Sequence, residues 1–130
     1  MADRTSSRPK ALLVEDEFLV ALDVEEQLTD LGFDVIGPLG RVAEAVYAAR
    51  RESDVAIAIL DVNLAGEMSW GVARALAERG IPFFFVSGYG AALANVPQDL
   101  ADARFLSKPV GSDLLRNTID ACTPGLPLAG

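Results

Sequence analysis

The sequence predicts one α/β domain, a doubly wound five-stranded parallel sheet with helices on both faces. Short apolar runs alternate along the chain with longer segments in which apolar residues recur at helical spacing. The most apolar run, residues 55–60, has no polar residue, as expected for a strand that is buried on both faces. Strands that alternate with helices imply parallel pairing with right-handed crossovers. A length of 130 residues fits a single domain.

The first half of the chain is expected to run strand, helix, strand, helix. A polar leader at residues 1–9, expected to be flexible, precedes the first strand at residues 10–14. A helix then covers residues 17–31 and is closed by Gly32 as a C-cap. A second strand at 33–36 ends at Gly37 and Pro38, and residues 41–51 form the second helix. The apolar positions that define the first helix are Phe18, Leu19, Leu22, Leu28 and Leu31.

The second half continues the alternation, with one weak segment. The third strand leads into Asp61, and a loop connects it to a helix at 70–79. Between residues 90 and 105 large apolar residues are few and Pro97 would break a helical turn, so we expect a short or irregular fourth helix among five. The domain should span residues 10–121, before a flexible tail at 122–130. The other expected elements are strands at 81–86 and 104–107 and a helix at 112–121.

Composition excludes several classes of function. The formal net charge is −8 and no cluster of Lys and Arg occurs, which argues against nucleic acid or an anionic membrane as a partner. Histidine is absent, so histidine-dependent nucleophile systems and imidazole zinc sites are excluded. The single cysteine, Cys122, cannot form an internal disulfide. The N-terminus lacks the apolar core of a signal peptide, and we expect a cytoplasmic protein without a membrane span.

Reactive side chains follow the ends of four expected strands. They are Glu15 and Asp16 after the first strand, Asp61 after the third, Ser87 after the fourth and Lys108 after the fifth. Because the carboxyl ends of parallel strands meet at one edge of a sheet, these groups should lie close together. Clustered carboxylates suit Mg²⁺, while a lysine and a hydroxyl suit phosphate oxygens. Together they are the parts of a site for phosphoryl transfer.

In order and spacing these motifs resemble the receiver domain of bacterial two-component response regulators, over about residues 10–121. The matching residues are the acidic pair at 15–16, D-V-N-L-A-G from Asp61, the hydroxyl of Ser87 and K-P at 108–109. The resemblance implies the flavodoxin-like strand order 2-1-3-4-5. The segment P-F-F-F-V-S-G-Y-G at 82–90 is similar to a subgroup of mostly stand-alone receivers with Gly-Tyr-Gly after strand four. In that subgroup the following helix is often poorly formed.

The resemblance also implies roles for individual residues. Asp61 would accept a phosphoryl group from a phosphohistidine of a sensor kinase or a histidine phosphotransfer protein. Asp16 would bind Mg²⁺ directly, Glu15 through water, and Asn63 through its backbone carbonyl. Two further residues, Lys108 and Ser87, would contact the phosphoryl oxygens.

Other positions imply a switch and depart from the common family pattern. Phe105 matches the aromatic switch position, and Ser87 supplies the hydroxyl of the switch. The bulky Tyr89 stands where many receivers have a small residue, and it could itself gate the site. The Lys108–Pro109 bond is expected to be cis. Glu15 replaces the commoner Asp and lengthens one arm of the metal shell. Ala65 replaces a frequent Pro, so the loop after Asp61 is expected to be more mobile.

Two function classes remain open. The first is a signalling switch that catalyses only its own phosphorylation and dephosphorylation, is monomeric or weakly dimeric, and acts through a downstream protein or a phosphoryl relay. No output domain is expected after residue 121. The alternative is an Mg²⁺-dependent aspartyl-phosphate phosphatase, which usually carries D-x-D where this chain has E-D-E at 15–17. A flavin carrier fits poorly because acids at this loop would repel phosphate.

Simpler interpretations apply to single residues. Asp61 alone could cap a turn, Glu15 to Glu17 could be the acidic first turn of a helix, and Phe105 could be ordinary core. Trp70 and Met68 are expected to pack over the third helix. Because Trp70 follows the loop from Asp61, we also expect its fluorescence to change when Mg²⁺ is added.

Overall fold

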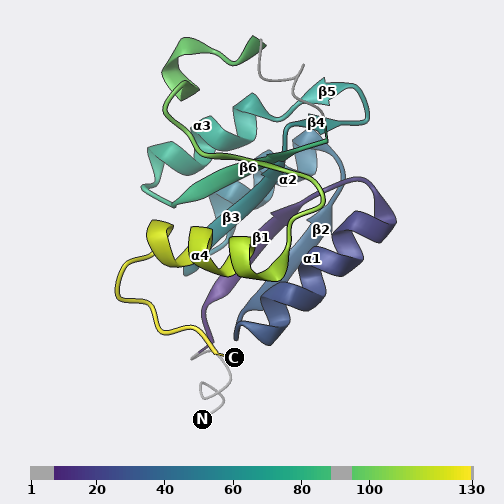
Figure 1. The fold of residues 1–130 in the computed structure, drawn as a ribbon. Coiled ribbons are helices and arrows are strands. Elements are labelled where there is room, and N and C mark those ends of the chain that lie inside the picture. The colour runs from purple at the N-terminus through teal and green to yellow at the C-terminus, as the bar shows by residue number, and fades with distance from the viewer. Residues whose placement is uncertain (1–7, 89–94, 130) are drawn as a thin grey trace.

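The computed structural model describes residues 8–88 and 95–129 and contains one five-stranded parallel sheet (Figure 1). The strand order is β2-β1-β3-β6-β7, which is the expected order 2-1-3-4-5 once the strands of this sheet are counted alone. The predicted fold class is therefore confirmed. The strands are β1 Lys10–Val14, β2 Asp34–Leu39, β3 Val55–Asp61, β6 Phe83–Ser87 and β7 Phe105–Ser107.

Helices cover both faces of the sheet. Figure 1 shows α1 (Phe18–Asp30) and α4 (Ser112–Cys122) on one face, and α2 (Val42–Arg51) and α3 (Trp70–Glu78) on the other. Except for the end of β2, these boundaries lie within two residues of those expected from the sequence. The pattern of apolar residues thus located nearly every regular element.

The core consists of two apolar layers, one on each side of the sheet. Residues of β3 alternate between them: Ala58 and Leu60 face the layer under α2 and α3, whereas Ile57 and Ile59 face the layer under α1 and α4. All four side chains are buried. Burying one Leu or Ile side chain stabilises a fold by roughly 1.5–3 kcal/mol, so this central strand anchors both layers. Asp61 stands at its carboxyl end.

The end of β2 was predicted wrongly. This strand continues through Gly37 and Pro38 to Leu39, with a shift in the pairing register between Leu12 and Val14. As an edge strand, β2 tolerates a proline that cannot donate to the ladder. Gly37 has φ +110°, and a Cβ there would lie 2.5 Å from the carbonyl oxygen of Leu13, so only glycine fits.

The buried stripe of α1 also differs from the expected one. Phe18, Leu19 and Leu22 are 74%, 75% and 51% exposed. The stripe that faces the sheet consists of Ala21, Val24 and Leu28. The three large side chains near the start of α1 therefore lie on the protein surface.

Two short elements occupy the loops at the carboxyl edge. Between β6 and β7, the described part of the chain (95–104) includes the short 3-10 helix η3 Gln98–Leu100, where a short or irregular helix was expected. The described residues contain four α-helices, and part of the segment in which the fourth of five helices was expected lies outside them. After β3, strands β4 (Asn63–Leu64) and β5 (Glu67–Met68) form a small antiparallel hairpin that was not predicted. Ala65 and Gly66 both have positive φ at its turn, as in a type I′ hairpin.

Both ends of the described chain contact the domain. Arg8 donates hydrogen bonds to the carbonyls of Thr29, Gly32 and Phe33 at the end of α1. Near the C-terminus, Leu126 and Leu128 pack against the core layer under α1 and α4. The flexibility of residues 1–9 and 122–130 stays a prediction. Among the described residues, no helix combines the length and apolar character that a membrane span requires.

Candidate metal and phosphoryl site at the carboxyl edge

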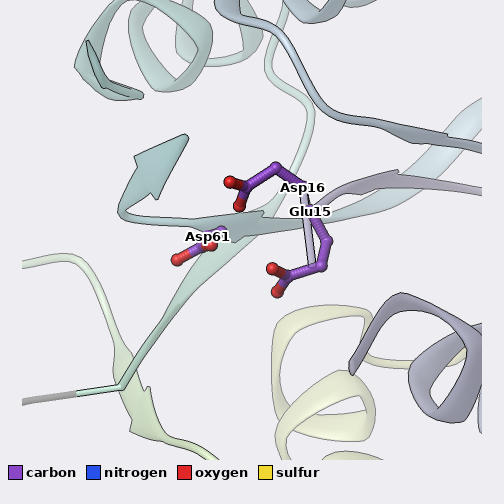
Figure 2. Close-up of side chains that lie close together, drawn as sticks. All are labelled: Glu15, Asp16 and Asp61. Carbon is purple, nitrogen blue, oxygen red and sulfur yellow. The ribbon is translucent and has the colours of Figure 1, made fainter. Parts of the chain in front are cut away.

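Three carboxylates meet where β1 and β3 end. Glu15 and Asp16 directly follow β1, and Asp61 is the last residue of β3. One carboxylate oxygen of each lies within 4.8 Å of the others, and Figure 2 shows the three side chains close together. Glu15 and Asp61 are buried, whereas Asp16 is exposed. The structure therefore brings together the acids that the sequence placed at one edge.

The ammonium group of Lys108 lies among these acids. Its Nζ is 3.0 Å from Glu15 Oε1, 3.2 Å from Asp61 Oδ2 and 3.0 Å from Glu17 Oε1. The lysine follows β7, its backbone N–H donates to the Ser87 carbonyl, and its peptide bond to Pro109 is cis. Burial lowers the pKa of Lys108, but hydrogen bonds to Glu17 and Glu15 and the charge of Asp61 outweigh this effect. The net result is a pKa above the usual value for lysine. The lysine is a permanent cation here.

Asp61 is the acid with the perturbed pKa. The pKa of Asp61 is raised from 3.8 to about 7 in total. Burial is the largest cause, the negative charge of Glu15 and a hydrogen bond with it act in the same direction, and Lys108 opposes the change. One lysine cannot neutralise four neighbouring carboxylates, those of residues 15, 16, 17 and 61. Oxygen ligands in this number suit a hard divalent cation such as Mg²⁺. The residues therefore fit the metal that the sequence led us to expect.

Asn63 lies beside Asp61 in the hairpin. Its backbone N–H is 3.4 Å from Asp61 Oδ1, and its side-chain oxygen accepts a hydrogen bond of 2.6 Å from the Gly66 N–H. This second bond fixes the tight turn of the hairpin. A metal contact through the Asn63 carbonyl stays a prediction.

The structure places the remaining expected site residues as follows. Ser87 ends β6 at the same edge as Asp61 and is buried. Phe105 is partly buried and stacks on Phe85 with ring centroids 4.8 Å apart, while Trp70 meets Phe85 edge to face at 5.3 Å. Phe105 therefore belongs to an aromatic cluster in the core, and its switch role stays a prediction. Tyr89 lies outside the described residues.

Two contacts of the site were missed by the sequence reasoning. Glu17 was interpreted only as part of an acidic first turn, yet it pairs with Lys108; three consecutive acids were the available signal. Ser69 was not noticed, although its hydroxyl donates to the backbone carbonyl of Asp61 at 2.6 Å. No sequence pattern pointed to this bond, because it depends on the hairpin that brings residue 69 back to residue 61.

The protein is an α/β domain with a flavodoxin-like sheet, and acids and a lysine meet at the carboxyl edge of that sheet. Such a site is suited to bind a metal ion and a phosphoryl group. Comparison with solved structures narrows this class of domain. The chain belongs to the receiver domains of response regulators. It is 37% identical to SdrG from Sphingomonas melonis Fr1, a stand-alone receiver, with a TM-score of 0.76 over 89% of this chain and 97% of that chain.

Two further solved structures have the same fold. A response regulator receiver protein from Sinorhizobium medicae WSM419 is 27% identical, with a TM-score of 0.77 over 92% of this chain and 98% of that chain. The receiver domain of sensor histidine kinase PA1611 from Pseudomonas aeruginosa PAO1 shares the fold at 20% identity and a TM-score of 0.71, over 89% and 98% of the two chains. That domain holds a magnesium ion in its active site cleft. No protein-family model and no curated protein matches the sequence.

Proposed function

We propose that the protein is a phosphoacceptor switch in which Asp61 accepts a phosphoryl group from a phosphohistidine on a sensor kinase or a histidine phosphotransfer protein. One observation carries this proposal: the buried Asp61 carboxylate ends the central strand 3.2 Å from the Lys108 ammonium and beside two further acids. Membership of the receiver family supports a signalling switch rather than a general enzyme. Output would pass through protein contacts or a phosphoryl relay.

The chemistry follows from the positions of these groups. An oxygen of ionised Asp61 attacks the phosphorus of the donor, a P–O bond forms, the P–N bond breaks, and the imidazole leaves. Lys108 lies close enough to Asp61 to pair with an oxygen of the transferred phosphoryl group. The Ser87 hydroxyl would donate a hydrogen bond to a second phosphoryl oxygen. Asp16, Asp61 and the Asn63 carbonyl would hold Mg²⁺, with Glu15 acting through water. The bound metal would supply neutralising charge.

The surface next to the site fits a protein donor. The exposed Phe18, Leu19 and Leu22 follow Glu17 along α1. Beside them, a cleft of about 450 Å³ is lined by Leu19, Val24, Lys108, Pro109 and Val110, among others. Exposed apolar side chains that border a reactive group are typical of a protein contact. We infer that the histidine-bearing segment of the donor docks here. A cytoplasmic location and a monomeric or weakly dimeric state stay predictions.

Mixing the protein with Mg²⁺ and a small acyl phosphate tests the proposal. Intact mass spectrometry should detect one added phosphoryl group, and Asp61→Asn should abolish it. Asp54→Asn is a matched control, because Asp54 is exposed, has φ +61° and immediately precedes β3 at its opposite end. Asparagine tolerates that conformation well. Rapid turnover of unrelated phosphomonoesters without an adduct would instead favour the phosphatase.

A further inference from the structure

A fully buried hydroxyl bonds to the backbone of the proposed phosphoacceptor. Ser69 has no exposed surface, and its Oγ donates a hydrogen bond of 2.6 Å to the carbonyl oxygen of Asp61. Charged and polar side chains that are buried without a partner are costly, so a buried hydroxyl generally has a defined contact. In this case the contact is the residue proposed to receive the phosphoryl group.

The hydroxyl of Ser69 does not serve the function common at its position. Ser69 is the N-cap residue of α3, where a serine oxygen usually accepts a hydrogen bond from an N–H of the first turn. Its side chain makes no such bond, and Val72 N–H instead bonds to the Ser69 backbone carbonyl at 3.1 Å. The hydroxyl is thus directed away from its own helix and toward Asp61.

The bond to Asp61 closes the base of the β4–β5 hairpin. The Ser69 N–H donates to the Val62 carbonyl at 2.9 Å, next to the bond between the Ser69 hydroxyl and Asp61. Between these residues, Asn63 pairs with Met68 across the hairpin. Two hydrogen bonds from Ser69 therefore hold the base of the hairpin that carries Asn63. One of them is accepted by the backbone carbonyl of Asp61 itself.

We propose that Ser69 is a positioning residue for phosphoryl acceptance, which fixes the backbone of Asp61 and the hairpin that carries Asn63. This inference rests on the proposed function of Asp61. Without the hydroxyl, the Asp61 peptide group and the hairpin gain freedom to shift relative to Lys108. Because a displacement of about 1 Å at a reacting group can cost on the order of 100-fold in rate, a modest shift should be measurable.

The test compares Ser69→Ala with Thr123→Val. Thr123 is a matched control, because its buried Oγ1 also donates at 2.6 Å to a backbone carbonyl, that of Ile119 at the end of α4. Both variants lose one buried hydroxyl bond of equal length. The measured quantity is the rate at which acetyl phosphate phosphorylates the folded protein at saturating Mg²⁺. We expect a fall of about tenfold or more for Ser69→Ala and less than about twofold for Thr123→Val.

A second variant decides the result if Ser69→Ala does not fold. Ser69→Cys has nearly the same shape and only a weak S–H donor, so its rate should lie below that of Thr123→Val. Rates of Ser69→Ala or Ser69→Cys equal to that of Thr123→Val, alongside normal phosphorylation of the wild type, would overturn the role of Ser69 alone. Failure of the wild-type protein to become phosphorylated would overturn the proposed function and this inference together.

Discussion

Lys108 links the buried Asp61 to the exposed Glu17: its ammonium lies 3.2 Å from Asp61 Oδ2 and 3.0 Å from Glu17 Oε1. Glu17 is 62% exposed at the side chain, whereas the side chain of Asp61 is 7% exposed. The ammonium group of Lys108 is therefore shared between a buried carboxylate, Asp61, and an exposed one, Glu17. When Asp61 gains the charge of a phosphoryl group, Lys108 should favour the buried partner and release Glu17.

This competition predicts the effect of Glu17→Gln. Removing the exposed charge reduces repulsion of an incoming phosphate and frees Lys108, so phosphorylation by acetyl phosphate should become faster. Exposed ion pairs are weak, and we expect the increase to stay below about fivefold. Glu26→Gln, at an exposed position on α1, the helix that begins directly after Glu17, serves as the control. A slower rate in Glu17→Gln than in this control would contradict the competition.

Asp61→Asn should stabilise the metal-free protein. Asp61 is buried beside Glu15, and its charged form is disfavoured by both its burial and that neighbour. An amide removes this cost, and we expect the free energy of unfolding in urea to rise by about 2 kcal/mol above pH 7. Saturating Mg²⁺ should shrink the difference, because the metal stabilises the wild-type carboxylate. A variant that is less stable than the wild type in the metal-free state would show that the buried charge of Asp61 is not unfavourable.

The pH dependence of stability should carry the signature of the same group. Folding raises the pKa of Asp61 from 3.8 to about 7, mainly through burial. Between these values the folded protein retains a proton that the unfolded chain releases, so stability from this residue is full below the lower pKa and is lost as pH rises through the higher one. Subtracting the pH profile of Asp61→Asn isolates this contribution in metal-free buffer. Profiles that stay parallel across the range would show that the pKa is not raised.

Trp70 should report metal binding by its fluorescence. It directly follows Ser69, whose hydroxyl bonds to Asp61, and its ring meets Phe85 edge to face in the core. A movement of the Asp61 backbone on metal binding would therefore be passed to Ser69 through their hydrogen bond, and from Ser69 to the neighbouring Trp70. We expect Mg²⁺ to change the emission and Asp16→Asn to suppress the change. An unaltered spectrum at saturating metal would indicate that the indole does not sense the site.

The strand ends explain why so much of the site was predictable from the sequence. Asp61 and Lys108 each follow a short apolar run, and parallel strands deliver their carboxyl ends to one edge whatever the details of packing. The order of these motifs also matched the receiver family. Glycine and proline were less informative: Gly37 and Pro38 suggested the end of a strand, but an edge strand accommodated both.

Contacts that depend on tertiary packing were not predictable. The large residues Phe18 and Leu22 suggested a buried stripe on the first helix, yet smaller residues such as Ala21 face the sheet. Helical periodicity identifies a helix but does not decide which of two apolar stripes is covered. Likewise, Ser69 reaches Asp61 only because an unpredicted hairpin folds residue 69 back onto residue 61.

Peptide mapping after phosphoryl transfer tests the central claim most directly. The wild-type protein would be mixed with Mg²⁺ and a histidine-phosphorylated transfer protein, then digested and analysed by mass spectrometry for the modified residue. A single phosphoryl group on Asp61, absent from Asp61→Asn and present in Asp54→Asn, is the result that we predict. A phosphoryl group on another residue, or equal modification of both variants, would contradict the assignment of Asp61 as the phosphoacceptor.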